Sequence, residues 1–355
     1  MNGASGHWVV ERARADIRAL TPYSHAAWEP TLERMHANEL PCRVNGDRST
    51  AGLNRYPEPQ PPALVQGLAQ LYGVRAEQVL VGRGSDEAID LLLRVFCRAG
   101  VDNIIHCPPT FGMYAVAARI QGAEVRAVPL QASAGFALDE AAVLAAVDDN
   151  TKLVFVCSPN NPTANAVPPG QLLQLAGKLA PRAMLVVDEA YIDFATVQSL
   201  CPLLDATPNL AILKTLSKAH GLAGARVGAL LAAPEIIALT RKVIPPYAIT
   251  ELTVEAVVPQ LQPAAVAAMR AGIAGILAER TRLAAGLARS PLVTRVWPSD
   301  ANFLLVDCTD AGAVLARARG AQLIIRDVRQ SALPCSVRIS VGTPAQNTRL
   351  LESLA

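Results

Sequence analysis

Residues 183–218 read AMLVVDEAYIDFATVQSLCPLLDATPNLAILKTLSK and contain two apolar runs, 183–187 and 210–213, each followed directly by polar residues. Short apolar runs of this kind are typical of buried strands. Their apolar residues are nearly continuous rather than alternating, as expected where helices cover both faces of a parallel sheet. This stretch therefore predicts an α/β domain.

The same pattern extends outward from this stretch, starting at about residue 78. Apolar, β-branched runs alternate with longer Ala- and Leu-rich amphipathic stretches, which is the arrangement of parallel strands joined by crossover helices. We predict a mostly parallel seven-stranded sheet flanked by helices, with ligands at the carboxyl ends of the strands. The strand candidates are 78–81, 103–107, 124–128, 152–157, 183–187, 210–213 and 226–231.

The pattern changes after residue 245, where Pro245 and Pro246 interrupt the chain and a long helical stretch follows. We predict a large ligand-binding domain at 45–245 and a smaller α+β domain at 246–355. The segment 1–44 is expected to pack with the small domain, because prolines break it into pieces too short to form a core alone. Strand candidates in the small domain are 293–297, 302–306, 322–325 and 336–339.

Composition narrows the classes of function. Hydrophobic residues make up 51% of the 355 residues and charged residues 17%, with a formal net charge of +2. This indicates a well-packed globular protein without the basic surface that nucleic acid requires. The seven cysteines form no C-x-x-C pair and no cluster with metal-ligand spacing, so we expect reduced thiols, no metal site and a cytoplasmic location. No membrane span is expected, because charged residues or proline interrupt the apolar stretches.

The strongest single motif is Thr215-Leu216-Ser217-Lys218, which directly follows an apolar run. A lysine at the carboxyl end of a strand is partly desolvated, which lowers its pKa and frees its amine to condense with an aldehyde. The hydroxyls of Thr215 and Ser217, with the guanidinium of Arg226, suit a phosphate dianion. The alternative for Ser-Lys alone is a solvated surface pair.

The second motif is Val187-Asp188-Glu189-Ala190-Tyr191, in which an apolar run ends in a carboxylate. A buried carboxylate needs a cationic partner. The protonated pyridine nitrogen of pyridoxal phosphate is such a partner, and the pairing makes the ring an electron sink. The alternative is that Asp188 only caps the following turn.

The third motif is Cys157-Ser158-Pro159-Asn160-Asn161-Pro162-Thr163, again at the end of an apolar run. Its two prolines restrict the loop and direct Asn161. The amide can donate to a ring hydroxyl or a substrate carboxylate without adding charge. Asn-Pro turns are common, so this motif gains weight only beside the others.

The fourth motif is Gly82-Arg83-Gly84-Ser85-Asp86-Glu87, a turn between a strand and a helix. Such a turn directs backbone N–H groups and the helix dipole at an anion. It lacks both the full G-x-G-x-x-G spacing and a Walker lysine, which argues against a dinucleotide or P-loop site. A plain N-cap by Ser85 or Asp86 is the alternative.

Together the four motifs resemble those of fold type I pyridoxal-phosphate aminotransferases. Within that superfamily, Asn54-Arg55-Tyr56-Pro57, S-P-N-N-P-T, D-E-A-Y and T-L-S-K-A with Arg226 resemble the histidinol-phosphate aminotransferase family, over nearly the whole chain. The resemblance implies that Lys218 holds the cofactor as a Schiff base and acts as general acid and base, while Asp188 pairs with the pyridine nitrogen.

The resemblance also implies roles for the other motif residues. Asn161 and Tyr191 would hold the ring hydroxyl, and Phe111 would stack on the ring where the family often has Tyr. Ala164 stands where the family usually has Gly, which leaves the conformation of that loop open. The remaining cofactor-binding residues, most of them around the phosphate, would be Gly84, Ser85, Asp86, Thr215, Ser217 and Arg226.

For the substrates, the resemblance implies that Arg338 meets an α-carboxylate. Arg326, Tyr23 and Tyr56 would meet the phosphate of histidinol phosphate or the distal carboxylate of glutamate, with Tyr56 serving the neighbouring subunit of a homodimer. The alternative for each arginine is a local ion pair, for example with Asp327.

The implied reaction is ping-pong transamination between L-histidinol phosphate and 2-oxoglutarate, giving imidazole-acetol phosphate and glutamate in histidine biosynthesis. Three alternatives stay open at this point. A decarboxylase like threonine-phosphate decarboxylase uses the same cofactor, and a broad aromatic or branched-chain aminotransferase would act on phenylalanine or leucine. A catalytically silent regulatory protein of this fold would be expected to lose the lysine or to carry a DNA-binding arm.

Overall fold

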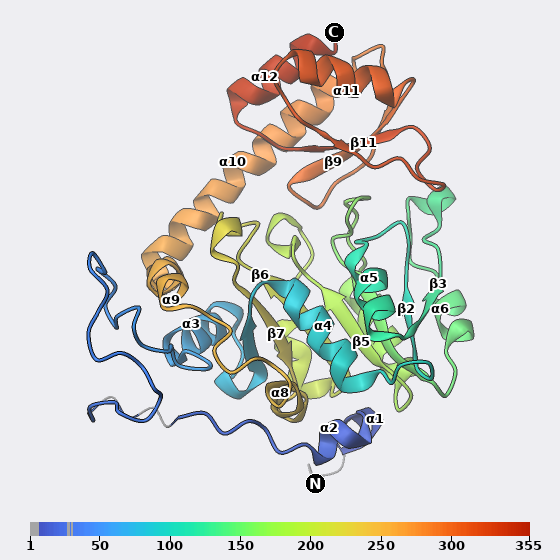
Figure 1. The fold of residues 1–355 in the computed structure, drawn as a ribbon. Coiled ribbons are helices and arrows are strands. Elements are labelled where there is room, and N and C mark those ends of the chain that lie inside the picture. Colours follow the sequence, from blue (N-terminus) through green and yellow to red (C-terminus); the bar gives the residue numbers. More distant parts are fainter. Residues whose placement is uncertain (1–6, 27–28, 30) are drawn as a thin grey trace.

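The computed structural model describes residues 7–26, 29 and 31–355, and its larger part is built on a seven-stranded sheet (Figure 1). The strand order is β1-β7-β6-β5-β4-β2-β3. Strands β2 to β6 pair in parallel, whereas β7 runs antiparallel to both of its neighbours, β1 and β6. The prediction of a mostly parallel seven-stranded sheet is confirmed. The strands are β1 Val79–Gly82, β2 Asn103–His106, β3 Glu124–Ala127, β4 Thr151–Cys157, β5 Met184–Asp188, β6 Leu210–Thr215 and β7 Gly228–Ala232.

Two apolar cores, one on each face of the sheet, explain why the strand sequences are continuously apolar. In β5, Leu185 and Val187 belong to one core, whereas Met184 and Val186 belong to the other, because successive side chains point to opposite faces. Helices α3, α6 and α7 contribute to the first core, and α4, α5 and α8 to the second. These helices are α3 Pro62–Tyr72, α4 Ser85–Phe96, α5 Met113–Gln121, α6 Glu140–Ala146, α7 Pro169–Leu179 and α8 Pro234–Arg241.

The connections contain short helices. The α-helix α9, Glu251–Val257, leads toward the second domain. The 3₁₀ helices are η1 Ala76–Gln78, η2 Ala132–Ala134, η3 Ile192–Phe194, η4 Cys201–Ala206, η5 Ala223–Ala225 and η6 Val258–Leu261.

The C-terminal part folds around an antiparallel four-stranded sheet of order β10-β11-β9-β8, with its own core (Figure 1). The strand expected at 322–325 is wrong: these residues form a turn and irregular chain, and a two-residue strand follows them. Leu323 and Ile325 are apolar because they pack against that core, not because they pair with a strand. The elements are α10 Pro263–Leu287, β8 Val293–Val296, β9 Phe303–Cys308, α11 Ala311–Gly320, β10 Arg326–Asp327, β11 Ser336–Ser340 and α12 Pro344–Ser353.

Helix α10 is the longest helix of the described chain and joins the two parts. Across the described residues, no individual helix has both the length and the apolar character needed to cross a membrane. The combined segments Glu251–Leu261 and Pro263–Leu287 meet that criterion by length and composition only, and they are bent by 74° relative to each other.

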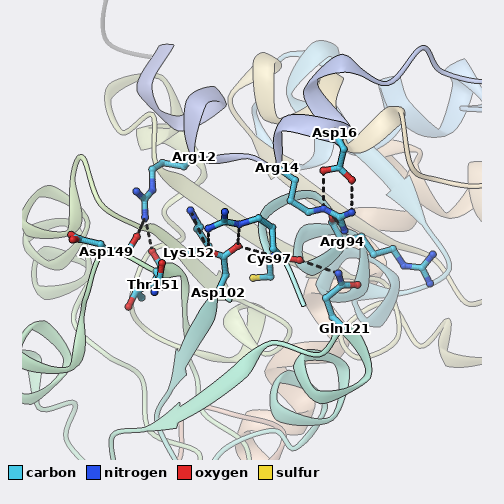
Figure 2. A network of polar contacts seen from close by, with 12 residues as sticks. Arg12, Arg14, Asp16, Arg94, Cys97, Asp102, Gln121, Asp149, Thr151 and Lys152 are labelled. Carbon is cyan, nitrogen blue, oxygen red and sulfur yellow. Dashed lines mark hydrogen bonds and ion pairs between the residues drawn. The ribbon is translucent and has the colours of Figure 1, made fainter. Parts of the chain in front are cut away.

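The N-terminal segment differs from its expected position. Its described helices, α1 His7–Arg12 and α2 Ala15–Ala19, lie beside the large domain and away from the small one (Figure 1). Val9 is buried in the core shared with α4 and α8. Figure 2 shows Arg12 donating to the backbone carbonyls of Asp149 and Thr151, at 2.7 and 3.2 Å. Apolar burial and these carbonyl acceptors draw the segment onto the large domain.

Candidate active site

A cavity of about 830 Å³ opens at the carboxyl ends of the parallel strands and is lined by both domains. The large domain contributes most of the predicted site residues. Those lining the cavity are Ser85, Asp86, Phe111, Asn161, Asp188, Tyr191, Thr215, Ser217, Lys218 and Arg226, joined by Arg326 and Arg338 from the small domain. The structure thus brings together side chains that are as far apart as 85 and 338 in the sequence.

The antiparallel direction of β7 explains how Arg226 reaches this edge. Arg226 precedes β7, and the start of β7 lies beside the end of β6, where Gly228 pairs with Thr215. Gly228 is required there, because a Cβ atom on it would lie 2.4 Å from the backbone nitrogen of Ser85. Gly84 has φ +90°, a conformation that favours glycine. The two glycines let the turn before α4 pack closely against β7.

This turn forms an anion cradle. Helix α4 begins at Ser85, so its free N–H groups and positive dipole end lie at the cavity. The Arg226 guanidinium donates to Ser217 Oγ at 3.4 Å and to Asp86 Oδ2 at 3.3 Å. A phosphate dianion fits this set of backbone, hydroxyl and guanidinium donors.

Asp188 ends β5 as a buried carboxylate that is 3% exposed. Its Oδ2 accepts the Tyr114 hydroxyl at 2.7 Å, and its Oδ1 accepts the backbone N–H of Ala190 at 3.0 Å. Burial raises the pKa of Asp188 to about 6, although both hydrogen bonds lower it. Because its partners are a phenol and an amide, a protonated ring nitrogen fits as the cation that would favour the charged form.

Lys218 faces the same cavity from the loop after β6. Partial burial lowers the pKa of its ammonium group, and the positive charge of Arg338 acts in the same direction. Its Nζ lies 5.6 Å from the centroid of the Tyr191 ring. Burial raises the pKa of the Tyr191 hydroxyl, so that group keeps its proton at neutral pH and can donate a hydrogen bond.

The two predicted arginines of the small domain lie opposite each other on paired strands, β10 and β11. Arg338 donates from Nη1 to Asn161 Oδ1, which links the domains. Burial lowers the pKa of Arg338, and neighbouring Arg326 contributes to this. Asp327, the local partner considered for Arg326, forms its ion pair with Arg329 at 2.7 Å. The cavity wall therefore presents two guanidinium groups to an anion.

Three predicted residues do not line the cavity of this chain. Gly84 lies just behind it, against Arg226. Tyr23 and Tyr56 lie on the surface, 72% and 49% exposed. The Tyr56 ring stacks on Tyr247 with a centroid distance of 4.6 Å. The sequence expectation had assigned Tyr56 to a neighbouring subunit.

Sequence reasoning missed some residues of the site and left the conformation of one loop undecided. Tyr114 binds Asp188, but in the sequence it is one more aromatic residue on the buried face of an amphipathic helix. Nothing in the sequence around it indicates this contact. Arg329 and Thr110 line the cavity from loops without a motif. Ala164, whose conformation the sequence left open, is buried with φ +67°, so the loop keeps the left-handed conformation that glycine favours.

Comparison with known proteins shows the family of this chain. The family model of aminotransferase class I and II matches residues 27–354. A histidinol-phosphate aminotransferase of Stenotrophomonas maltophilia (strain R551-3) is 44% identical over 352 residues, which cover 98% of this chain and 96% of the relative. The chain therefore belongs to the aminotransferase class I and II family, and the resemblance read from its motifs is confirmed.

Solved structures agree at the level of the fold. Histidinol-phosphate aminotransferase from Sinorhizobium meliloti, in complex with pyridoxal-5'-phosphate, is similar with a TM-score of 0.77 and 27% identity over 84% of this chain and 82% of that one. L-threonine-O-3-phosphate decarboxylase from Porphyromonas gingivalis has a TM-score of 0.68 and 22% identity over 85% of this chain and 90% of that one. The second likeness reflects the shared fold alone.

Proposed function

We propose that this chain catalyses pyridoxal-phosphate-dependent transamination between L-histidinol phosphate and 2-oxoglutarate, giving imidazole-acetol phosphate and glutamate in histidine biosynthesis. The observation that carries the proposal is one cavity that combines Lys218, buried Asp188 and the anion cradle at Ser85 with two facing arginines. The name of the relative that is 44% identical over nearly its full length supports the choice of substrate.

The chain's own residues suit pyridoxal phosphate. The cradle of Ser85, Thr215, Ser217 and Arg226 would hold its phosphate, and Asp188 its ring nitrogen. When bound, this cofactor supplies an aldehyde that condenses with amines and a ring that accepts the electrons of a broken bond at Cα. Asn161 and Tyr191 would orient the ring hydroxyl, and Phe111 would cover one ring face.

Lys218 carries the proton transfers in this proposal. Its lowered pKa increases the fraction of free amine at neutral pH, which is the form that can accept a proton from substrate Cα. The ammonium formed in this way would then donate that proton to C4′, the carbon of the cofactor's aldehyde group, and the reverse half-reaction would use the same group. The two half-reactions share one site, which predicts ping-pong kinetics.

Charge at the cavity wall selects the substrates. Arg338 would bind the α-carboxylate of glutamate or 2-oxoglutarate as a bidentate partner. Arg326 would bind the phosphate of histidinol phosphate or the second carboxylate of glutamate. A dianionic substrate gains from two guanidinium groups that already repel each other, since its charge relieves that repulsion.

We also propose that the working unit is a homodimer in which Tyr56 and Tyr23 meet the substrate phosphate in the neighbouring site. The segment from residue 20 to 56 exposes many large apolar side chains on one stretch of chain, which is typical of a surface that another protein covers. They are Leu20, Tyr23, Leu32, Met35, Leu40, Val44, Leu53 and Tyr56. A cytoplasmic location is part of the proposal, and the seven free thiols suit a reducing compartment.

The test is a single half-reaction. Purified protein loaded with pyridoxal phosphate is mixed with L-histidinol phosphate without a keto acid, and the visible absorption of the bound cofactor is followed. We expect rapid loss of that band, and no loss in Lys218→Ala. Lys178→Ala is the matched control, because Lys178 pairs with Glu140 on the surface and should react like the wild type.

Comparison amines decide the substrate. O-phosphothreonine and phenylalanine are tested under the same conditions, and the products are analysed for a keto compound and for carbon dioxide. Faster reaction of either amine than of histidinol phosphate would refute the substrate assignment while leaving Lys218 in its role. Carbon dioxide release from O-phosphothreonine would instead identify a decarboxylase.

A further inference from the structure

Tyr114 is a buried polar residue that lies behind the cavity. It is the second residue of α5, is fully buried, and does not line the cavity, although Phe111 and Met113 do. A buried phenol hydroxyl needs a hydrogen-bond partner. Tyr114 finds it in Asp188 Oδ2, at 2.7 Å.

With this hydrogen bond, each oxygen of the Asp188 carboxylate accepts one hydrogen bond. Oδ2 accepts from the Tyr114 hydroxyl, and Oδ1 accepts from the Ala190 backbone N–H at 3.0 Å. With a donor on each oxygen, the carboxylate cannot rotate about its last bond without losing one of them. Hydrogen bonds to the charged form also favour that form, so Tyr114 works against the burial that raises the pKa of Asp188.

The ring of Tyr114 is itself held rigidly. It stacks on Phe155 of β4, with a centroid distance of 5.0 Å and an interplanar angle of 13°. It also meets Phe111 edge to face, at 5.6 Å and 83°. Such aromatic contacts favour specific orientations. One side chain therefore touches both the group assigned to the ring nitrogen and the group assigned to the ring face.

We infer that Tyr114 is a positioning residue for the cofactor: its hydroxyl fixes the orientation of the Asp188 carboxylate, and its ring fixes Phe111. The inference rests on the proposed function, because it concerns how these two groups meet pyridoxal phosphate. Tyr114 acts through Asp188 and Phe111 and does not itself reach the cavity. The competing explanation is an ordinary core tyrosine whose hydroxyl uses Asp188 as a convenient acceptor.

Tyr114→Phe separates the two explanations, because it keeps the aromatic ring and removes only the hydroxyl. The matched control is Tyr72→Phe, which removes a phenol hydroxyl from the side of the sheet where Lys214 lies. We expect the dissociation constant of pyridoxal phosphate, measured by titration of the apoprotein, to rise about tenfold in Tyr114→Phe, the scale of one hydrogen bond to a charged group. In Tyr72→Phe it should stay at the wild-type value.

A second readout does not need the cofactor. The urea midpoint of the apoprotein is measured from pH 4 to 8, and the pH at which Asp188 loses its proton is read from the change in stability. Removing the Tyr114 donor should move that pH upward, whereas Tyr72→Phe should leave it unchanged. Equal cofactor affinity and an equal pH midpoint in Tyr114→Phe and wild type would overturn the inference, even if the variant is less stable. A wild-type protein that does not bind pyridoxal phosphate would refute the proposed function, and the apoprotein titration would still decide whether Tyr114 holds Asp188.

Discussion

Two consecutive carboxylates lie at the end of β5 and have opposite surroundings: Asp188 is the last residue of the strand, and Glu189 follows it directly. Both are buried, at 3% and 2% exposed. Asp188 meets a phenol and an amide beside the cavity. Glu189 meets Lys214 Nζ at 2.5 Å, the Ser199 hydroxyl and the Leu200 N–H. Alternation along a strand directs neighbouring side chains to opposite faces.

The difference indicates that Asp188 is placed for function, whereas the hydrogen bonds and ion pair of Glu189 are all made within the fold. Glu189 has a complete set of partners, including the buried ammonium of Lys214. Burial lowers the pKa of that ammonium, but Glu189 and other nearby groups raise it by more, so the net shift is upward. Asp188 has hydrogen bonds, but among the described residues no ammonium or guanidinium is bonded to it, and burial raises its pKa to about 6. A buried charge left in this state costs stability and is typical of functional sites.

Breaking the ion pair between Lys214 and Glu189 should have the largest effect on stability. Lys214→Met removes the ammonium and leaves Glu189 buried without its counter-ion, which costs about 3 to 5 kcal/mol of unfolding free energy. Urea unfolding of the apoprotein measures this. Cofactor affinity of the folded variant should stay close to wild type. A loss below about 1 kcal/mol would mean that Glu189 does not depend on Lys214.

Removing the charge of Asp188 should have the opposite effect and stabilise the apoprotein. Because the folded pKa of about 6 exceeds the unfolded value near 4, the folded protein keeps a proton that the unfolded chain has lost, and stability falls as the pH rises through this window. Asp188→Asn removes this fall, so the variant should gain up to roughly 3 kcal/mol on wild type above pH 6. Below pH 4 the difference should be smallest.

The same Asp188→Asn variant should lose activity while it gains stability. Asp188→Asn should lose at least about 10²-fold in transamination rate, the scale of removing one electrostatic partner of a reaction. The half-reaction with histidinol phosphate measures it. An Asn variant that is fully active, or that shows the wild-type stability profile between pH 4 and 8, would contradict the role given to Asp188.

Removing both charges of the other pair sharpens the contrast. The double variant Lys214→Met with Glu189→Gln should lose less than Lys214→Met alone, about 1 to 2 kcal/mol, because no uncompensated charge remains. Urea midpoints of the two single variants and the double variant give the coupling energy. Additive losses would show that Lys214 and Glu189 act independently.

The smallest effect is expected at Tyr72, whose ring centroid lies 5.1 Å from Lys214 Nζ. Tyr72→Leu removes a cation–π contact with a desolvated ammonium, which costs about 1 to 2 kcal/mol. Tyr72→Phe retains the ring and should cost less. Thermal unfolding of both variants checks the order, and a larger loss in Tyr72→Phe would assign the effect to the hydroxyl instead.

Much of the fold and of the cavity followed from local patterns. The seven apolar runs placed the strands, and the polar residues after them, such as Lys218 and Asn161, do line one cavity. Errors occurred where an apolar pattern has two structural explanations. Leu323 and Ile325 looked like a strand but pack against a core from irregular chain. Segment 1–44 had no local signal for its partner, and Val9 is buried on the large domain.

The sequence by itself determined the class of fold and the edge of the sheet at which ligands gather, because strand period and turn chemistry are local properties. The kind of cofactor followed from the resemblance of its motifs to a known family. Only the tertiary structure showed how the neighbouring lysine, Lys214, is used. Lys214 and Lys218 are four residues apart, yet one pairs with Glu189 in the core and the other lines the cavity. It also decided that Tyr114 binds Asp188 across 74 residues. The physical reason is that a buried charge takes its partner from whichever elements pack against its face, and no local pattern encodes that packing.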